Sequence, residues 1–214
     1  MNQRFSLGRL AREELTDGHT RSEIEYVYYG QIQNPAILDQ AAHVEDQVQW
    51  EIKIAKTEGN YSSGRQRVRM IHPVGSPAQA KFELTTKVKV EQEDPQGQDL
   101  PNRERENTVS ASLELFQIYE MMSECGMHKR RYTIPIEGYS GLNWQVDRFY
   151  LAGGEQLSAW CKIDIEVDQP REIPKQIPGF INLITNQKGY QSSAEQKLIQ
   201  RLYNDIFLMK NKYL

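Results

Sequence analysis

The sequence predicts an α+β fold in which antiparallel strands close into an eight-stranded β-barrel, with helices packed outside. Three observations predict this fold. Segments with alternating polar and apolar residues, typical of strands, recur along the 214-residue chain. Their polar positions carry charges, and one sign of charge dominates in each segment. Two other segments place apolar residues at the spacing of a helix face.

Composition favours a soluble globular protein, with 38% hydrophobic and 26% charged residues and a net charge of −3. A general nucleic-acid-binding protein would be basic overall, so the basic segments indicate a local site. The only cysteines, Cys125 and Cys161, lack the CxxC spacing of zinc sites and favour a reducing compartment. No apolar run approaches the roughly 20 residues of a membrane span. The N-terminus lacks a signal-peptide core, so we expect a cytoplasmic protein that does not bind membranes.

Residues 1–21 are expected to form a polar N-terminal extension, and residues 22–214 one domain that includes a C-terminal helix. Strands are expected where β-forming residues alternate between turn signals such as Gly30. A turn rich in glycine, asparagine and serine divides one segment into a hairpin. The expected strands are residues 22–30, the two arms of the 48–72 hairpin, and residues 80–92, 129–138, 143–153 and 159–168.

Helices are expected at residues 34–47, 108–126 and 192–210. In the second helix, the apolar residues recur at helical spacing and Gly126 is a suitable stop. In the third, Ser192 and Glu195 have the spacing of a capping box. An apolar stripe then follows at Leu198, Leu202, Ile206 and Met209. Residues 93–102 and 169–179 are expected to be loops.

The charged positions of the strands fall in phase, so each set points to one face of its strand. The sets are Glu23 and Glu25; Arg65, Arg67 and Arg69; Thr85, Lys87 and Lys89; Lys129, Arg131 and Thr133; and Lys162, Asp164, Glu166 and Asp168. Three arginines side by side repel one another, so an anion must offset their charge. We interpret these faces as the inside of the barrel, where about eight strands leave room for one small ligand. Carboxylates suit Mg²⁺ or Mn²⁺ and the basic side chains suit a polyanion, so a di- or triphosphate site is expected.

The order of these motifs resembles that of the CYTH superfamily, the triphosphate tunnel metalloenzymes. The motifs are E-x-E, R-x-R, T-x-K, K-x-R, an aspartate and [DE]-x-E, and the resemblance spans about residues 22–190. The family contains inorganic triphosphatases, thiamine triphosphatases, class IV adenylate cyclases and some RNA 5′-triphosphatases. The resemblance implies an eight-stranded antiparallel tunnel with helices outside. It also implies a metal-dependent phosphohydrolase acting on tripolyphosphate, thiamine triphosphate or a nucleoside triphosphate.

The resemblance implies three sets of site residues. The catalytic set is Glu23, Glu25 and Glu166. The substrate-binding set is Arg67, Arg69, Lys87, Lys129 and Arg131, to which we add Arg65 and Lys89 because they are in phase on the same strands. The metal set, for Mg²⁺ or Mn²⁺, is Glu23, Glu25, Asp147, Asp164 and Glu166. In addition, Glu104 and Glu106 match an R-x-E-x-E strand of the family.

Some positions depart from the family pattern. Val27 stands where the family has a lysine, Asp164 where it usually has a glutamate, and Leu183 where a closing motif has a glutamate. Residue 27 should face the tunnel, where valine leaves a small apolar patch. We expect a lysine introduced there to fold and to favour tripolyphosphate over nucleoside triphosphates.

Other functions remain open on the sequence. The same fold could bind a nucleotide or polyphosphate without turnover. The basic residues could instead belong to an RNA 5′-triphosphatase or an RNA-binding module, whose affinity would depend on RNA length and salt. Adenylate cyclase chemistry would require a ribose 3′-hydroxyl near the α-phosphate, which the rim loops at 73–80 and 93–102 would determine.

Overall fold

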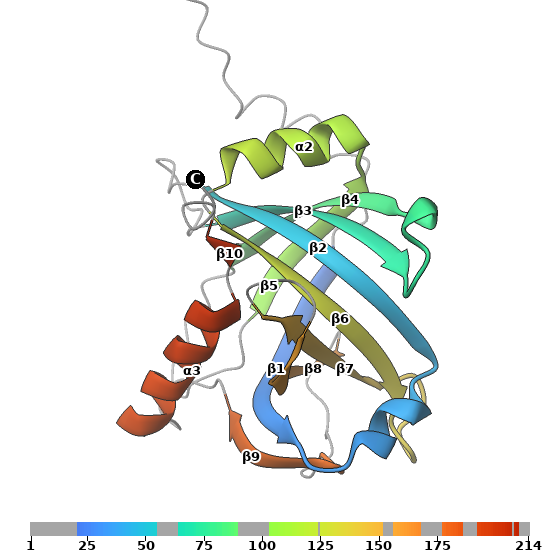
Figure 1. Ribbon diagram of the computed structural model, residues 1–214, viewed down its shortest axis with the longest axis vertical. Helices are drawn as coiled ribbons and strands as arrows, with labels where there is room; N and C mark the ends of the chain where they lie inside the picture. The colour runs from blue at the N-terminus through green and yellow to red at the C-terminus, as the bar shows by residue number, and fades with distance from the viewer. Residues whose placement is uncertain are drawn as a thin grey trace, which may run out of the picture.

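The strands of the protein form one antiparallel sheet, accompanied by short helices, in an α+β arrangement (Figure 1). The structure is a computed structural model that describes residues 21–54, 64–89, 103–123, 125–151, 156–167, 177–185, 192–206 and 208–209. Residues 1–20 of the predicted N-terminal extension and the loop at 93–102 lie outside this part, whereas Arg21 already belongs to the first strand. None of the described helices has the length and apolar character needed to cross a membrane.

Ten strands are described. They are β1 (Arg21–Ile32), β2 (His43–Ile54), β3 (Gly64–Pro73), β4 (Lys81–Lys89), β5 (Arg103–Ser110), β6 (Cys125–Pro135), β7 (Asn143–Tyr150), β8 (Leu157–Val167), β9 (Phe180–Thr185) and β10 (Leu208–Met209). The helices are η1 (Pro35–Gln40) and η2 (Pro77–Gln79), which are 3₁₀ turns, and the α-helices α2 (Leu113–Met122) and α3 (Ser193–Ile206).

Neighbouring strands follow the order β10-β6-β2-β3-β4-β5-β1-β8-β7, and β9 pairs with the second half of β1. The last strand in this order, β7, also pairs with β6, from Phe149 opposite Lys129 to Asn143 opposite Pro135. Each strand from β1 to β8 therefore has hydrogen-bonded partners on both sides.

The predicted strands are confirmed, with shifted ends, but two of the predicted helices are wrong in extent. Of residues 34–47, only Pro35–Gln40 is helical, because β2 begins at His43 and pairs with β6. Residues 103–110 form β5 between β4 and β1, so the helix expected at 108–126 begins only at Leu113. The side chain of Ser112 caps this helix by accepting a hydrogen bond from the Leu115 amide, at 3.2 Å.

The capping box predicted for the last helix is confirmed. The Ser192 hydroxyl accepts a hydrogen bond from the Glu195 amide (3.3 Å), and the Glu195 carboxylate accepts one from the Ser192 amide (2.7 Å). The helix ends at Ile206, earlier than the predicted residue 210, and Met209 of the predicted stripe lies instead in β10, which pairs with β6. Strand β9, which follows the predicted loop at 169–179, was not predicted as a strand.

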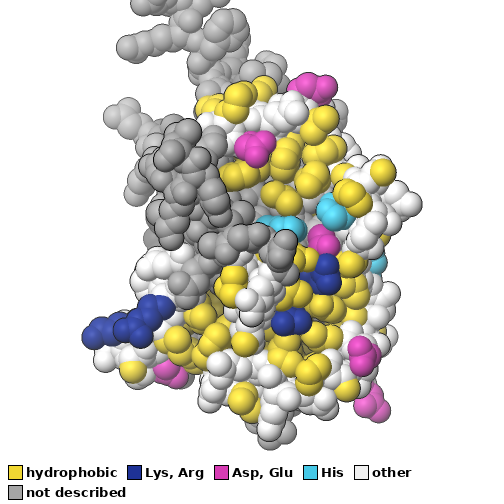
Figure 2. All heavy atoms as spheres, viewed as in Figure 1, with side chains coloured by type: hydrophobic (Ala, Val, Ile, Leu, Met, Phe, Trp, Pro, Cys, Tyr) yellow, Lys and Arg dark blue, Asp and Glu magenta, His cyan; other side chains and the backbone are white. Residues whose placement is uncertain are grey.

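The strands present two chemically different faces. The face that we call the charged face carries Glu25, Glu51, Arg65, Arg67, Arg69, Lys87, Glu106, Lys129, Arg131, Asp147, Lys162, Asp164 and Glu166. Residues directly opposite in antiparallel strands point to the same side, so the register extends this face from strand to strand. The opposite face is mainly apolar, although it also carries the buried Asp46, which is paired with Arg130. The view in Figure 2 shows hydrophobic side chains over much of the coloured surface, with charged side chains at scattered positions.

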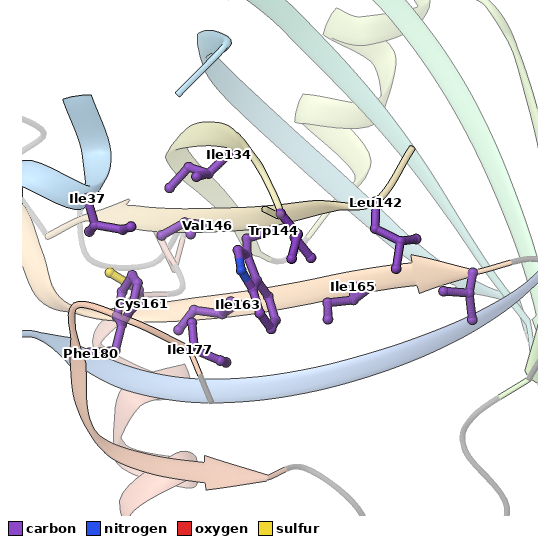
Figure 3. Close-up of a cluster of buried hydrophobic side chains, with 12 residues drawn as sticks. Ile37, Ile134, Leu142, Trp144, Val146, Cys161, Ile163, Ile165, Ile177 and Phe180 are labelled. Carbon is purple, nitrogen blue, oxygen red and sulfur yellow. The ribbon is translucent and has the colours of Figure 1, made fainter. Parts of the chain in front are cut away.

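The apolar face is covered in two regions. One core cluster lies over β6, β7, β8 and β1, where Ile163, Ile165 and Val146 are fully buried (Figure 3). Ile37 of η1 and the residues around Phe180 cover this cluster. The other cluster contains Trp50, Val68 and Leu84, and α2 packs on it through Phe116 and Tyr119. Helix α2 therefore lies outside the sheet, as predicted.

Helix α3 packs differently. Its residues Ile199 and Leu202 join Ile184 of β9 in a cluster with Val27, Tyr29 and Phe149. The strand parity places these last three side chains on the charged face. The apolar stripe of α3 thus covers an apolar region of the charged face, and of the two described α-helices only α2 packs on the apolar face as predicted.

Candidate functional site

A cavity of about 120 Å³ lies on the charged face. Seven strands contribute to its walls, namely β1, β2, β3, β4, β6, β7 and β8. The lining residues are Glu25, Tyr29, Gln49, Glu51, Arg65, Arg67, Lys87, Met127, Lys129, Arg131, Asp147, Phe149, Lys162, Asp164 and Glu166. This size accommodates several water molecules or a small charged group.

Most of the site residues predicted from the sequence line this one cavity. They are Glu25, Arg65, Arg67, Lys87, Lys129, Arg131, Asp147, Asp164 and Glu166. Arg69 lies on the same face but is not part of the cavity wall. For Glu23 and Lys89 the structure describes only the backbone, in which each residue is opposite Glu104. Their predicted roles therefore lie outside the described side chains.

On the basic wall, Glu106 of β5 offsets part of the positive charge. Its carboxylate receives Lys87 Nζ at 2.5 Å and lies 3.6 Å from Arg67 Nη2. Burial alone would raise the pKa of Glu106, but Arg67 and Lys87 outweigh burial and lower it to about 2. The protein thus supplies an anion of its own to this part of the basic wall. The Nε atom of Arg67 is nevertheless buried and hydrogen-bonds to no described residue.

Arg69 is held at the end of this wall by Glu83 and Thr85. Its Nη2 atom donates to Glu83 Oε2 at 3.0 Å and to Thr85 Oγ1 at 3.3 Å. Burial, with the nearby charges of Arg67 and Arg131, lowers the pKa of Arg69 to about 10. Arg69 therefore remains charged near neutral pH and contributes to the positive potential of the wall.

Asp147 is enclosed by two cations. Lys129 Nζ donates to Asp147 Oδ2 at 2.5 Å, and Arg131 forms a bidentate pair through Nε to Oδ1 (2.6 Å) and Nη2 to Oδ2 (2.8 Å). Burial opposes ionisation, yet Arg131 and Lys129 hold the pKa of Asp147 well below its usual range. Both carboxylate oxygens are engaged, so this arrangement does not fit the predicted role of Asp147 as a metal ligand.

The acidic wall is formed where β1 pairs with β8. Glu25 lies directly opposite Glu166, and Asp164 lies opposite Val27. Burial raises the pKa of Asp164 to about 6, assisted by Glu25 and Asp147 and despite the neighbouring Lys162. The Oδ1 atom of Asp164 is buried and accepts no hydrogen bond from any described residue. An unsatisfied buried acceptor of this kind is suited to a cation.

Glu25, Asp164 and Glu166 fit a divalent ion in their chemistry, because Mg²⁺ and Mn²⁺ prefer oxygen ligands. The unsatisfied Oδ1 atom of Asp164 supports this fit. Within the described part of the chain, however, no three Asp, Glu, His or Cys side chains converge as a ready-made metal site. Any metal ion would therefore require small movements of these carboxylates or additional ligands from the bound substrate.

One end of the cavity wall is apolar, with Tyr29, Met127 and Phe149. Val27 lies between Glu25 and Tyr29 on the same face but is only 6% exposed, because it packs in the cluster with α3. The valine that departs from the family pattern thus has a structural role, in that it contacts the region where α3 docks.

Lys162 is a cavity residue that the predicted site did not include. The acidic character of the KIDIEVD segment drew attention to its carboxylates. Lys162 is two residues before Asp164, so strand alternation places it on the same face. Glu51, Gln49 and the apolar wall residues were also not predicted, and they carry no distinctive motif.

Comparison with protein-family models and with curated proteins gives no match for this chain.

Proposed function

We propose that the chain is a CYTH-like triphosphate tunnel protein that binds a triphosphate-bearing small molecule and hydrolyses it with Mg²⁺ or Mn²⁺. The observation that carries this proposal is a pair of unsatisfied buried polar atoms in one cavity. Arg67 Nε is a donor on the basic wall, and Asp164 Oδ1 is an acceptor on the acidic wall. The first suits a phosphate oxygen and the second a cation. In this proposal the ring of paired strands acts as an eight-stranded tunnel.

The basic wall would hold the polyphosphate chain. Arg65, Arg67 and Lys87 come from adjacent strands, with Arg65 directly opposite Lys87. Hydrogen bonds from charged donors to phosphate oxygens each contribute about 1.5–3 kcal/mol. Arg131 is oriented by its bidentate contact with Asp147, so its position is fixed before a ligand arrives. Such preorganisation lowers the entropic cost of binding.

The acidic wall would serve the cleavage step. Glu25, Asp164 and Glu166 are the residues that would hold the divalent ion. When bound, such an ion supplies charge neutralisation of phosphate oxygens and a more acidic water for in-line attack. The carboxylate of Glu166 is the least engaged of the three, since its one described contact is a hydrogen bond from Gln145 Nε2 at 3.3 Å.

A binding protein without turnover is the second candidate. The engagement of both Asp147 oxygens by cations favours it, because this carboxylate is then not available as a ligand for the divalent ion. Both candidates require the basic wall to bind the polyphosphate, and they differ only in whether phosphate is released.

Tripolyphosphate is expected to raise the melting temperature of the protein clearly, whereas sulfate and monophosphate raise it much less. A ligand that binds the folded state at 100 times its Kd adds about 2.7 kcal/mol to the free energy of unfolding. Thermal melts with each anion at matched ionic strength measure this effect. Arg67→Met should abolish the shift, and Arg201→Met, at an exposed position of α3, should leave it intact. Equal shifts from all three anions would contradict a triphosphate-shaped site.

Glu166→Gln is expected to separate binding from hydrolysis. The substitution keeps the size of the side chain and removes the charge that would hold the divalent ion. We expect tripolyphosphate binding to be retained and phosphate release with Mg²⁺ or Mn²⁺ to fall at least about tenfold, which is about 1.4 kcal/mol in the activation barrier. A panel of triphosphates, scored for binding and for phosphate release, measures both. Binding without release by the wild-type protein would support the binding protein. Affinity for RNA that grows with RNA length and falls steeply with salt would instead support an RNA-binding module.

A further inference from the structure

Lys162 lies between two carboxylates of the acidic wall. Its Nζ atom donates to Asp164 Oδ2 at 2.6 Å and to Glu25 Oε1 at 3.0 Å. The lysine and the aspartate are on β8, and the glutamate is on the paired strand β1. One ammonium group therefore bridges two acidic side chains from neighbouring strands, inside the cavity proposed to bind the polyphosphate.

A cation is needed at this position for electrostatic reasons. Asp164 is 1% exposed and Glu25 is also largely buried, so their negative charges are poorly screened by water. Burial alone would lower the pKa of Lys162, but Asp164 and Glu25 raise it above its usual value. The ammonium group, through its contacts at 2.6 Å and 3.0 Å, thus supplies a counter-charge to both carboxylates.

Lys162 reduces the net negative charge that a polyanion would encounter at the acidic wall of the cavity. The basic side chains around the cavity are Arg65, Arg67, Lys87, Lys129, Arg131 and Lys162. The acidic ones are Glu25, Glu51, Asp147, Asp164 and Glu166. Without Lys162, the carboxylates of β1 and β8 would repel a polyphosphate across a narrow cavity, and a divalent ion would have to neutralise them first. With Lys162 in place, the contact with Glu25 and Asp164 already supplies this neutralisation.

We propose that Lys162 takes the place of a divalent ion during substrate capture, so that the cavity binds polyphosphate in the absence of metal and requires metal only for cleavage. This inference rests on the proposed function and specifies how its metal dependence is divided between binding and hydrolysis. It assigns Lys162 the role of a positioning residue, which acts by holding the carboxylates of the acidic wall.

The first test measures tripolyphosphate binding to the wild-type protein by isothermal titration calorimetry, once with EDTA and once with Mg²⁺. We expect the two dissociation constants to agree within about threefold, since a tenfold difference would correspond to a real coupling between metal and ligand. Binding that occurs only with Mg²⁺ would overturn the role of Lys162 while leaving the proposed function intact. The absence of binding under both conditions would overturn the proposed function itself.

The second test uses Lys162→Met, which keeps the length of the side chain and removes its charge. We expect tripolyphosphate binding in EDTA to weaken at least about tenfold and to recover when Mg²⁺ is added. Lys81→Met is the matched control, because Lys81 is 64% exposed and lies outside the cavity. This control should bind like the wild type under both conditions. Equal loss of binding with and without Mg²⁺ in Lys162→Met would show an ordinary phosphate-binding lysine and would overturn the inference.

A third measurement keeps the test decisive if Lys162→Met is too unstable for calorimetry. Removing the ammonium group leaves Glu25 and Asp164 without their shared partner, so Mn²⁺ should bind there and raise the melting temperature of the variant. The wild type should show a much smaller Mn²⁺ effect. The double variant Lys162→Met with Asp164→Asn removes one charge of each sign and should melt close to the wild type. If Mn²⁺ stabilises wild type and Lys162→Met equally, Lys162 does not stand in for a metal ion.

Discussion

Asp147→Asn is expected to destabilise the protein by about 3–5 kcal/mol, the range found when one partner of a buried ion pair is removed. Asp147 is 1% exposed, and its two oxygens accept hydrogen bonds from Lys129 and Arg131. The amide would remove the carboxylate that Lys129 and Arg131 share, and leave Arg131 with Asp164, whose Oδ2 is 3.9 Å from Arg131 Nη2. Equilibrium denaturation in urea at neutral pH measures the loss. Asp39→Asn, at an exposed position in η1, is the matched control and should change the stability by less than about 0.5 kcal/mol.

The contacts of Asp147 with Lys129 and Arg131 also predict how the stability of the protein depends on pH. The folded protein holds the pKa of Asp147 below its usual value, so this carboxylate contributes stability above the unfolded-state pKa of about 4. The contribution is lost as the pH falls below that value, since the unfolded chain then binds a proton that the folded protein excludes. The difference between wild type and Asp147→Asn should therefore shrink as the pH is lowered from about 5 towards 2. A difference that stays constant over this range would mean that Asp147 is not paired as the structure has it.

The charged face was predictable because it depends on a local rule. Strand alternation has a period of two, so the in-phase charges of the RQRVR and KIDIEVD segments must share a face whatever the topology. The interpretation that these faces meet inside a barrel came from the sorting of the charges by strand, and the resemblance to a family agreed with it.

The pairing of individual charges was not predictable from the sequence. Lys162 meets Glu25 only because β8 pairs with β1 in one register, and these residues are 137 positions apart. The same holds for Glu106, which reaches Lys87 through the pairing of β5 with β4. Register depends on non-local hydrogen bonds and on packing, which a local pattern does not specify.

At the start of α2, the helical spacing of apolar residues was outweighed by the pairing of β5 with β4. Val109 fits the helical spacing of the residues that follow it, which favoured a helix from 108. In the structure, Val109 lies opposite Leu84 in β4, and its side chain packs in the apolar cluster beneath α2. The Ser112 cap was the better marker of the helix start, because a side chain that satisfies a free amide fixes the boundary itself.

Val27→Lys is expected to destabilise the protein by about 3 kcal/mol, in contrast to the expectation from the sequence that a lysine there would be accommodated. Val27 is buried with Phe149 of β7 and with Ile199 and Leu202 of α3. The longer side chain must displace this helix, and its ammonium group must leave water. Urea denaturation measures the cost, and Val27→Met is the control for size, because it extends the side chain without adding charge. We expect Val27→Met to lose about half as much stability or less, since methionine adapts to irregular space.

The destabilisation should be accompanied by release of α3 from the charged face. Limited trypsin digestion reports this release, since Lys197 and Arg201 lie on α3 and become cleavable when the helix undocks. The directly opposite residue, Asp164, has one unsatisfied oxygen that could accept a hydrogen bond from the new lysine. If that contact outweighs the packing cost, Val27→Lys will melt at or above the wild-type temperature with α3 protected. That result would show that the apolar contact between Val27 and α3 contributes little, and that the valine was not required for docking the helix.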